Sequence, residues 1–298
     1  MKKLNLFIIF VLVFALMSVT LTVYGVDVPT EAETEEKMEE IYTSTDMAVS
    51  GIFPPTWQDR SNLDKAIPDE TKEQITIGVT MSRMASPFFV AMVDAFEAEA
   101  EKYGHELIIM NADINLQKQS SDIDSLILKG VDALILNPIE PVSSEVDVQK
   151  CVRNGIPVIG VGLNFAPDVP VVTSILANNY FAGWEAGLAI GDHYEGLPIK
   201  SAVIIGGMGQ PMSESRLNGM LGGLVYKRQE QMGEPVTQEQ AIVMGFELWK
   251  SIRDRGNVTD EKHNLEVVSL GQGQWTNEVG LAAAQDILTA HPDINLLM

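Results

Sequence analysis

The chain has 298 residues, enough for about two domains of ordinary size, and 46% of its residues are hydrophobic, which excludes a disordered chain. Its 41 acidic residues outnumber 20 basic ones, and the formal charge of −21 excludes nucleic-acid binding by general electrostatics. The single cysteine, Cys151, excludes an intramolecular disulfide, and the four histidines lack metal-site spacing, so we expect no metal and no other cofactor.

Residues 1–25 have the order of a secretory signal peptide. A basic start, Met1-Lys2-Lys3, precedes the uncharged, strongly apolar stretch 4–23, and Val23 and Gly25 fit the −3 and −1 positions of a cleavage site. A stretch of about 20 apolar residues is also long enough to span a bilayer as an uncleaved anchor. Either way, we expect the functional part to be periplasmic.

Residues 26–74 form an acidic leader or N-terminal arm, rich in Glu, Thr and Pro. A short helix is expected over 31–42, and Pro54-Pro55 stops any continuation. Two interpretations stay open. The segment is a mobile leader before the folded part, or it is an arm that packs on the folded part through Phe53 and Trp57.

From residue 75 to 178 the pattern predicts a first α/β lobe. Glycines 104, 130 and 155 are the expected helix C-terminal caps. Nearly continuous apolar strands that alternate with amphipathic helices predict a parallel sheet covered on both faces. The expected strands are 75–81, 106–110, 132–137, 156–161 and 171–176, and the expected helices are 88–103, 117–129 and 141–154.

Residues 179–298 predict a second lobe of the same kind. The polar stretch 233–264 is longer than most connections, and its apolar patch AIVMGFELW suits a helix of its own. The last expected strand has no helix after it, so we expect an incomplete lobe in a fragment of a longer chain. The expected strands are 200–205, 265–270 and 293–298, and the expected helices are 181–194, 213–231 and 276–290. The predicted fold is two doubly wound, Rossmann-like parallel-sheet lobes joined by a hinge.

Five motifs in order carry a family resemblance: IGVTMSRMASPFFVAM, KGVDALILNPIEP, NGIPVIGVG, ILANNYFAGWEAG and ILTAHPDIN. Over about 75–298 the chain resembles periplasmic sugar-binding proteins of the ribose/galactose type. The resemblance implies two hinged lobes of the type 1 periplasmic binding fold, which close on one small ligand and deliver it to an ABC permease. It also implies about another third of the domain after residue 298.

Ligands of open α/β sheets bind beyond the carboxyl ends of the strands, which directs attention to the loop at 82–89. The hydroxyls of Ser82 and Ser86 suit sugar hydroxyls, and the pair Phe88 and Phe89 offers a flat apolar face to a sugar ring. The alternative is that one phenylalanine, more plausibly Phe89, starts the core stripe of its helix. The resemblance places Ser82, Ser86 and Phe88 on ligand-lining positions, although the family often has Asn where Ser86 stands.

The loop after the fourth strand departs from the family. Gly162 and Leu163 stand where the resemblance implies an Asp-Arg pair, and Asn164 is the nearby polar substitute. This departure argues against a ribose-like pyranose. It indicates a wider or less charged site, or one for another small polar molecule.

In the second lobe, the glycine-rich loop 206–213 follows a strand, but it lacks the spacing of a phosphate cradle, which favours a plain loop. Arg216, expected in the first turn of a helix, falls on the ligand-gripping arginine of the family; a solvent-exposed arginine is the alternative. Trp275 aligns with an aromatic residue that stacks on the ligand, with a core tryptophan as the alternative, and Gln274 is a plausible donor. Asn178 and Asn179 are interpreted as hinge and cap residues.

No catalytic set emerges, because Cys151 has no histidine nearby and there is no nucleophile elbow, so we expect no enzyme. We predict a monomeric extracytoplasmic solute-binding protein for a monosaccharide or similar ligand, with an ABC permease as partner. The alternative is a periplasmic sensor subunit for a membrane histidine kinase, whose partner surface would come from 26–74 and 233–264. Nucleic acid is not an expected partner.

Overall fold

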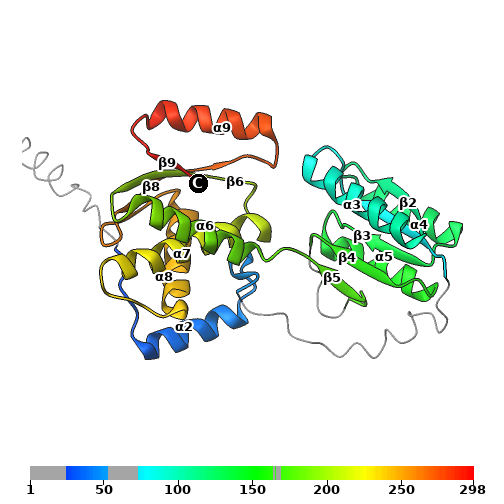
Figure 1. Ribbon diagram of the computed structural model, residues 1–298, viewed down its shortest axis with the longest axis horizontal. Coiled ribbons are helices and arrows are strands. Elements are labelled where there is room, and N and C mark those ends of the chain that lie inside the picture. The colour runs from blue at the N-terminus through cyan, green and yellow to red at the C-terminus, as the bar shows by residue number, and fades with distance from the viewer. Residues whose placement is uncertain (1–24, 53–72, 164, 166–168) are drawn as a thin grey trace, which may run out of the picture. The chain divides into compact units, whose positions relative to one another are not determined.

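The computed structural model describes residues 25–52, 73–163, 165 and 169–298 (Figure 1). These residues form two compact units, one built from 73–178 and the other from 25–52 together with 179–298. The chain passes from the first of these units to the second between Asn178 and Asn179, the two residues interpreted as the hinge. No helix within the described ranges is both long and apolar enough to cross a membrane.

The unit of residues 73–178 is a parallel sheet covered by helices, as the sequence predicts. Its five strands have the order β2-β1-β3-β4-β5, and every neighbouring pair is parallel. The strands are β1 (Thr76–Met81), β2 (Glu106–Asn111), β3 (Ala133–Leu136), β4 (Val158–Val161) and β5 (Thr173–Ile175), and the helices are α3 (Pro87–Tyr103), α4 (Leu116–Lys129) and α5 (Pro141–Arg153).

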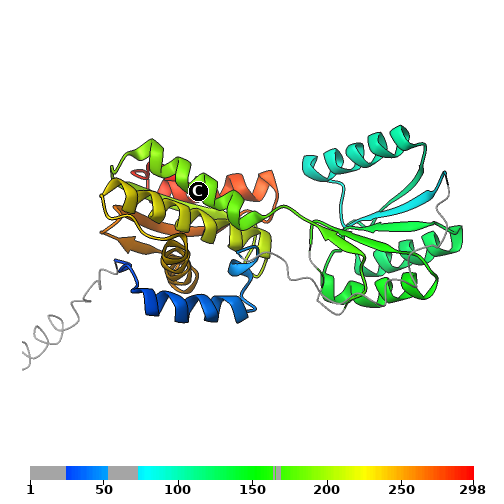
Figure 2. The ribbon, with the colours of Figure 1, turned by 60° about the horizontal axis from the view of Figure 1, so that its bottom comes forward.

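Side-chain alternation along the strands divides this unit into two core layers. On β1, Val79 and Met81 pack with Val93 of α3, while Gly78 points to the other face. A Cβ at Gly78 would lie 3.1 Å from a methyl carbon of Leu126 on α4. Figure 2 shows α3 on one face of the sheet and α4 and α5 on the other. The period of two therefore sets the doubly wound arrangement that the apolar strands predict.

The second unit has a four-stranded sheet in the order β7-β8-β6-β9. Strand β6 pairs in parallel with β8 and β9, but β7 is antiparallel to β8. The sheet is therefore not wholly parallel, because the expected connection 233–264 returns as a short hairpin. The strands are β6 (Ile199–Ile205), β7 (Val258–Asp260), β8 (Leu265–Gln272) and β9 (Leu296–Leu297), and the helices are α6 (Asn179–Tyr194), α7 (Pro211–Gln231), α8 (Gln238–Arg255) and α9 (Asn277–Ala290).

Helix α8 contains the apolar patch AIVMGFELW and belongs to the core of the second unit. Met244, Leu248, Trp249 and Ile252 are fully buried among residues of α7 and the sheet. In Figure 1, α9 covers one face of this sheet, and α6, α7 and α8 lie on the other. The segment that the sequence left as a long polar connection is thus a central layer of the unit.

Helices α6 and α7 cross with their backbones in direct contact. A Cβ at Gly183 or Gly187 of α6 would lie 1.9 or 2.1 Å from a carbonyl oxygen of α7. In return, a Cβ at Gly219 or Gly223 of α7 would lie 1.9 or 2.2 Å from a carbonyl oxygen of α6. Because real Cβ atoms essentially never come so close, glycine at four-residue spacing on both helices is what permits this crossing.

Residues 25–52, the first part of the expected leader, pack on the second unit. They include helix α2 (Glu31–Thr43) and the 3-10 turn η1 (Met47–Val49). Ile41, Val49 and Ile52 are buried in one cluster with residues of α6 and α8. Phe53 and Trp57, the expected anchors of the arm, lie outside the described residues, so the contacts of the arm come from other side chains.

Candidate functional site

At the carboxyl edge of the five-stranded sheet, one amide side chain connects three neighbouring strands. Ser82, which follows β1, donates through its backbone N–H and its hydroxyl to Oδ1 of Asn137, at 3.2 and 2.6 Å. Nδ2 of Asn137, which follows β3, donates to the carbonyl of Val161 at the end of β4, at 2.8 Å. Ser82 and Asn137 are both buried. Ser82 is therefore held at the edge where the sequence predicts ligand binding.

Gln119 completes this polar network from α4. Its Nε2 donates to the carbonyl of Asn137 at 2.9 Å, and its Oε1 accepts from the backbone N–H of Ile139 at 3.1 Å. Neither Asn137 nor Gln119 was among the predicted site residues. A signal for Asn137 exists in the sequence, because a polar residue directly follows the apolar strand ALIL; Gln119 becomes visible only when α4 is placed over the sheet.

The predicted residues at the start of α3 have distinct environments. Ser86 is the N-cap, and its hydroxyl accepts from the backbone N–H of Phe88 at 3.3 Å. The ring of Phe88 is 62% exposed, whereas Phe89 packs against the core cluster of Val79. The two rings meet edge to face, with their centroids 5.3 Å apart. Phe88 thus presents the free aromatic face, and Phe89 lies where the core alternative expects it.

Gly162 lies in close contact with the polar network. It has a positive φ of 79°, and a Cβ at this position would lie 2.9 Å from Nδ2 of Asn137. A side chain would therefore disturb both the left-handed backbone and the Asn137 amide. This gives a physical reason for glycine where the resemblance implies aspartate. Asn164, the predicted polar substitute, lies outside the described residues.

In the second unit, the loop of residues 206–210 follows β6. Its successive amides are engaged by side chains, because Gly207 donates to Ser213 Oγ at 3.0 Å, Met208 to Gln272 Oε1 at 3.4 Å, and Gly209 to Glu214 Oε1. Amides with these partners do not form a cradle for an anion, which agrees with the interpretation as a plain loop.

Trp275 lies over this loop. Its ring fills the space beside Gly206, since a Cβ there would lie 2.2 Å from Cε2 of the indole, and its Nε1 donates to Oε1 of Gln210. The side chain is 36% exposed, so it is not a core tryptophan. Gln274, whose Nε2 donates to Gln272 Oε1 at 3.3 Å, and Trp275 both have positive φ, at 50° and 57°. Such strain is concentrated at functional sites.

Arg216 lies in the second turn of α7, not in the first as expected, because the helix begins at Pro211 rather than at 213. Its position therefore does not oppose the positive end of the helix dipole as strongly as the sequence suggested. The guanidinium is exposed, and Nη2 donates to Oδ1 of Asn179, the first residue of α6, at 2.6 Å.

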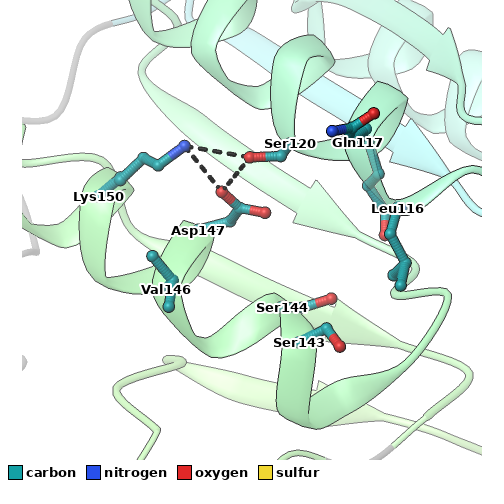
Figure 3. A pocket seen from close by; sticks show the side chains of 9 residues that line it. Leu116, Gln117, Ser120, Ser143, Ser144, Val146, Asp147 and Lys150 are labelled. Atoms are coloured by element: carbon teal, nitrogen blue, oxygen red, sulfur yellow. Dashed lines mark hydrogen bonds and ion pairs between the residues drawn. The ribbon is translucent and has the colours of Figure 1, made fainter.

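A separate pocket of about 250 Å³ lies between α4 and α5 (Figure 3). Its polar side chains bind one another, with Lys150 Nζ 2.9 Å from Asp147 Oδ1 and 3.1 Å from Ser120 Oγ. None of the eight residues predicted to bind ligand lines this pocket. Across the described ranges, no cluster of three or more His, Cys, Asp or Glu side chains is arranged for a metal ion.

Comparison with known proteins decides the family. The family model described as periplasmic binding protein domain matches residues 77–298. The chain belongs to this family. The match includes both sheets and the loops at their carboxyl edges.

Curated relatives of this periplasmic binding protein include ribose import binding proteins. It is 28% identical to that of Bacillus subtilis (strain 168) over 248 residues, which cover 83% of this chain and 67% of the relative. It is 26% identical to that of Escherichia coli (strain K12) over 219 residues, 74% of this chain and 61% of the relative. The chain thus spans between 61% and 67% of the length of these two relatives.

Solved structures of solute-binding proteins share the fold. A periplasmic solute-binding protein from Actinobacillus succinogenes with bound D-allose has a TM-score of 0.59 at 19% identity, covering 75% of this chain and 68% of that one. A solute-binding protein from Bacillus halodurans C-125 with bound myo-inositol has a TM-score of 0.56 at 20% identity, covering 77% and 68% less one part in a hundred, that is 67%, respectively. At these identities the comparison establishes the type 1 periplasmic binding fold.

Proposed function

We propose that this periplasmic binding protein captures a monosaccharide or a related polyol outside the cytoplasmic membrane and delivers it to an ABC permease. The names of its relatives support this proposal, since ribose import binding proteins belong to import systems. The observation that carries it is an exposed aromatic ring at each sheet edge, Phe88 in one unit and Trp275 in the other, beside fixed polar groups. Aromatic faces next to hydrogen-bonding groups suit the apolar face and the hydroxyls of a sugar.

The charge of the predicted residues favours a neutral ligand. Arg216 is the one predicted site residue with a charge, and its guanidinium already donates to Asn179. The remaining predicted residues are hydroxyl, amide and aromatic side chains: Ser82, Ser86, Phe88, Phe89, Asn164, Gln274 and Trp275. Such side chains exchange hydrogen bonds with hydroxyls without requiring a charged partner, as a polyol needs.

The mechanism we propose is hinge closure, with Asn178 and Asn179 in the hinge. A ligand that contacts both units only in the closed form shifts the equilibrium toward that form, because it supplies the necessary difference in affinity. We further propose that the protein is a monomer that reaches the periplasm through a signal peptide at 1–25, which lies outside the described residues.

The sensor alternative has no specific support from the structure. Its two candidate partner surfaces were 26–74 and 233–264. Of these, residues 25–52 bury Ile41 and Val49, and α8 buries Leu248 and Trp249, in the core of the second unit. Segments that fill a core are explained by packing, without a partner protein.

A thermal-shift screen tests the proposed function. The protein would be heated with D-ribose, D-allose, L-arabinose and myo-inositol, and with glutamate and leucine as non-sugar controls. A ligand that binds only the folded state raises the Tm, by about 2.7 kcal/mol of stabilisation at a concentration of 100 Kd. We expect a rise with at least one polyol and none with the amino acids. A rise with an amino acid alone, or with no compound in a broader sugar panel, would contradict the proposal.

A further inference from the structure

The N-terminal arm is joined to the second unit by buried polar contacts as well as by apolar packing. Ala48 in η1 is fully buried, and its carbonyl accepts from Nδ2 of Asn218 on α7 at 2.9 Å. Asp46 caps η1 by accepting from the backbone N–H of Ala48 at 3.0 Å, and its other carboxylate oxygen lies 2.5 Å from Nη1 of Arg253 on α8. The arm therefore lies against α7, the helix that follows the loop of the candidate site.

Glu214 lies in the first turn of α7 and is 4% exposed. Its carboxylate accepts from the backbone N–H of Gly209 in the 206–210 loop. It also lies within the electrostatic reach of Asp46 from the arm and of Arg253 from α8. A buried carboxylate is costly unless it has partners, so its retention here needs a reason.

The loop that Glu214 holds is the loop on which Trp275 rests. Gln210 accepts from Nε1 of the indole, and Gly206 leaves the space that the ring fills. Displacement of the Gly209 backbone would therefore move both supports of Trp275, because they lie within three or four residues of Gly209 on the same short loop.

We propose that Glu214 is a positioning residue that couples the N-terminal arm to the 206–210 loop and so sets the orientation of Trp275. The proposal rests on the proposed function only for the consequence that ligand affinity depends on Glu214. The coupling from Asp46 through Arg253 and Glu214 to Gly209 concerns this chain alone.

The electrostatics of Glu214 add a pH dependence. Burial raises the pKa of this carboxyl, the bond from Gly209 lowers it, the negative charge of Asp46 raises it and the positive charge of Arg253 lowers it, with a net rise. Protonation weakens Glu214 as an acceptor for Gly209, because a bond to an ionised carboxylate is the stronger one. The loop is therefore held best above the raised pKa and is loosened as the pH falls through it.

Fluorine NMR of the full chain labelled with 5-fluorotryptophan tests this coupling without a ligand. The Trp275 resonance is assigned with Trp275→Phe. We expect Glu214→Ala to shift it most and Glu214→Gln less, because glutamine can still accept from Gly209. Glu230→Gln is the matched control, since Glu230 lies at the other end of α7 and pairs with Lys227. Unchanged resonances of the buried Trp184 and Trp249 show that a variant is folded. A Trp275 resonance that stays in place in a folded Glu214→Ala protein overturns the proposal.

A pH titration of the same resonance tests the charge network. We expect a midpoint above the ordinary glutamate pKa of about 4.3 in the wild type and no such step in Glu214→Gln. Asp46→Asn should lower the midpoint, because it removes a negative charge and frees Arg253 to act on Glu214. A step that persists in Glu214→Gln would contradict the assignment.

Isothermal titration with D-ribose, or with the polyol that stabilises the protein most, separates this proposal from the proposed function. We expect Glu214→Gln to weaken binding by about threefold to tenfold, the effect of one ordinary hydrogen bond, and Glu230→Gln to leave it unchanged. If no polyol binds the wild type, the proposed function fails while the NMR experiment still decides the coupling. If a polyol binds and Glu214→Gln changes neither affinity nor the Trp275 resonance, the coupling fails and the proposed function stands.

Discussion

The indole ring of Trp275 occupies the space that a side chain at residue 206 would need, with Cε2 only 2.2 Å from where a Cβ on Gly206 would lie. A methyl group at residue 206 therefore has to displace the ring. We expect Gly206→Ala to lose most of the binding energy that Trp275 contributes, about 1–3 kcal/mol, measured by titration with the stabilising polyol. Gly280→Ala is the control, since a Cβ there would meet no atom closer than 4.0 Å. Equal affinity of the two variants would refute a role for the contact between Gly206 and Trp275.

The crossing of α6 and α7 should not tolerate a single added methyl group. A Cβ at Gly219 would lie 1.9 Å from the carbonyl oxygen of Tyr180, and backbone atoms cannot move aside as a flexible side chain can. We expect Gly219→Ala to lower the free energy of unfolding by about 3 kcal/mol or more. Gly280→Ala in α9 should instead raise it by about 0.5–1 kcal/mol, because alanine restricts the unfolded chain. Urea denaturation measures both, and a Gly219→Ala protein as stable as the wild type would disprove the close crossing.

The hydroxyl of Tyr180 is buried and, among the residues that the structure describes, has no hydrogen-bond partner. Burial also raises the pKa of this phenol, so the group stays neutral. We expect Tyr180→Phe to leave stability unchanged or to raise it by up to about 1 kcal/mol, because it removes an unsatisfied polar group. The comparison is Tyr194→Phe, which loses a bond to the carbonyl of Asn295 at 2.6 Å and should cost about 0.5–1.5 kcal/mol. A clear loss of stability in Tyr180→Phe would indicate a partner for the hydroxyl.

The sequence predicted well those features that local periodicity determines. Both α3 and α4 end at the expected glycines, Gly104 and Gly130, which have a φ of 72°. Each strand of the first sheet lies within its expected range to a residue or so, because apolar runs and glycine caps are local signals.

The remaining features depend on packing that no local pattern shows. Strand β7 has only three residues, VTD, and forms because β8 offers a free edge. The arm looks acidic and mobile in sequence, yet a few apolar side chains such as Ile41 and Val49 anchor it. Arg216 moved from the first turn to the second because Pro211 extends the helix by two residues, which suits proline in the first turn. Glu214 reads as one more surface carboxylate until α7 is placed against the arm.

Glu247 ties the arm to α8 in a pH-dependent way. Burial raises the pKa of this carboxyl, but hydrogen bonds and charges from Lys250 and Lys37 outweigh burial and lower it below 4.5 overall. A lowered folded pKa means that the group stabilises the protein above the unfolded value and that this contribution is lost as the pH falls through the folded one. The side chains are partly exposed, so we expect a contribution of about 0.2–1 kcal/mol.

The measurement is the free energy of unfolding between pH 3 and pH 7. Glu247→Gln should be less stable than the wild type at pH 7 and should approach it as the pH falls below 4.5. Glu99→Gln is a control for an exposed pair with Lys102 that does not involve the arm. A constant difference between Glu247→Gln and the wild type across the whole range would argue against the carboxylate pairing.

Calorimetric titration of aromatic variants tests the capture of a polyol by aromatic rings at the two sheet edges most directly. The proteins are the wild type, Phe88→Ala, Trp275→Ala and, as control, Tyr103→Ala, whose ring is 61% exposed at the far end of the helix that carries Phe88. We expect Phe88→Ala and Trp275→Ala each to weaken binding of the polyol by ~1–3 kcal/mol, and Tyr103→Ala to leave it unchanged. A polyol that binds all four proteins with the same Kd would contradict this account.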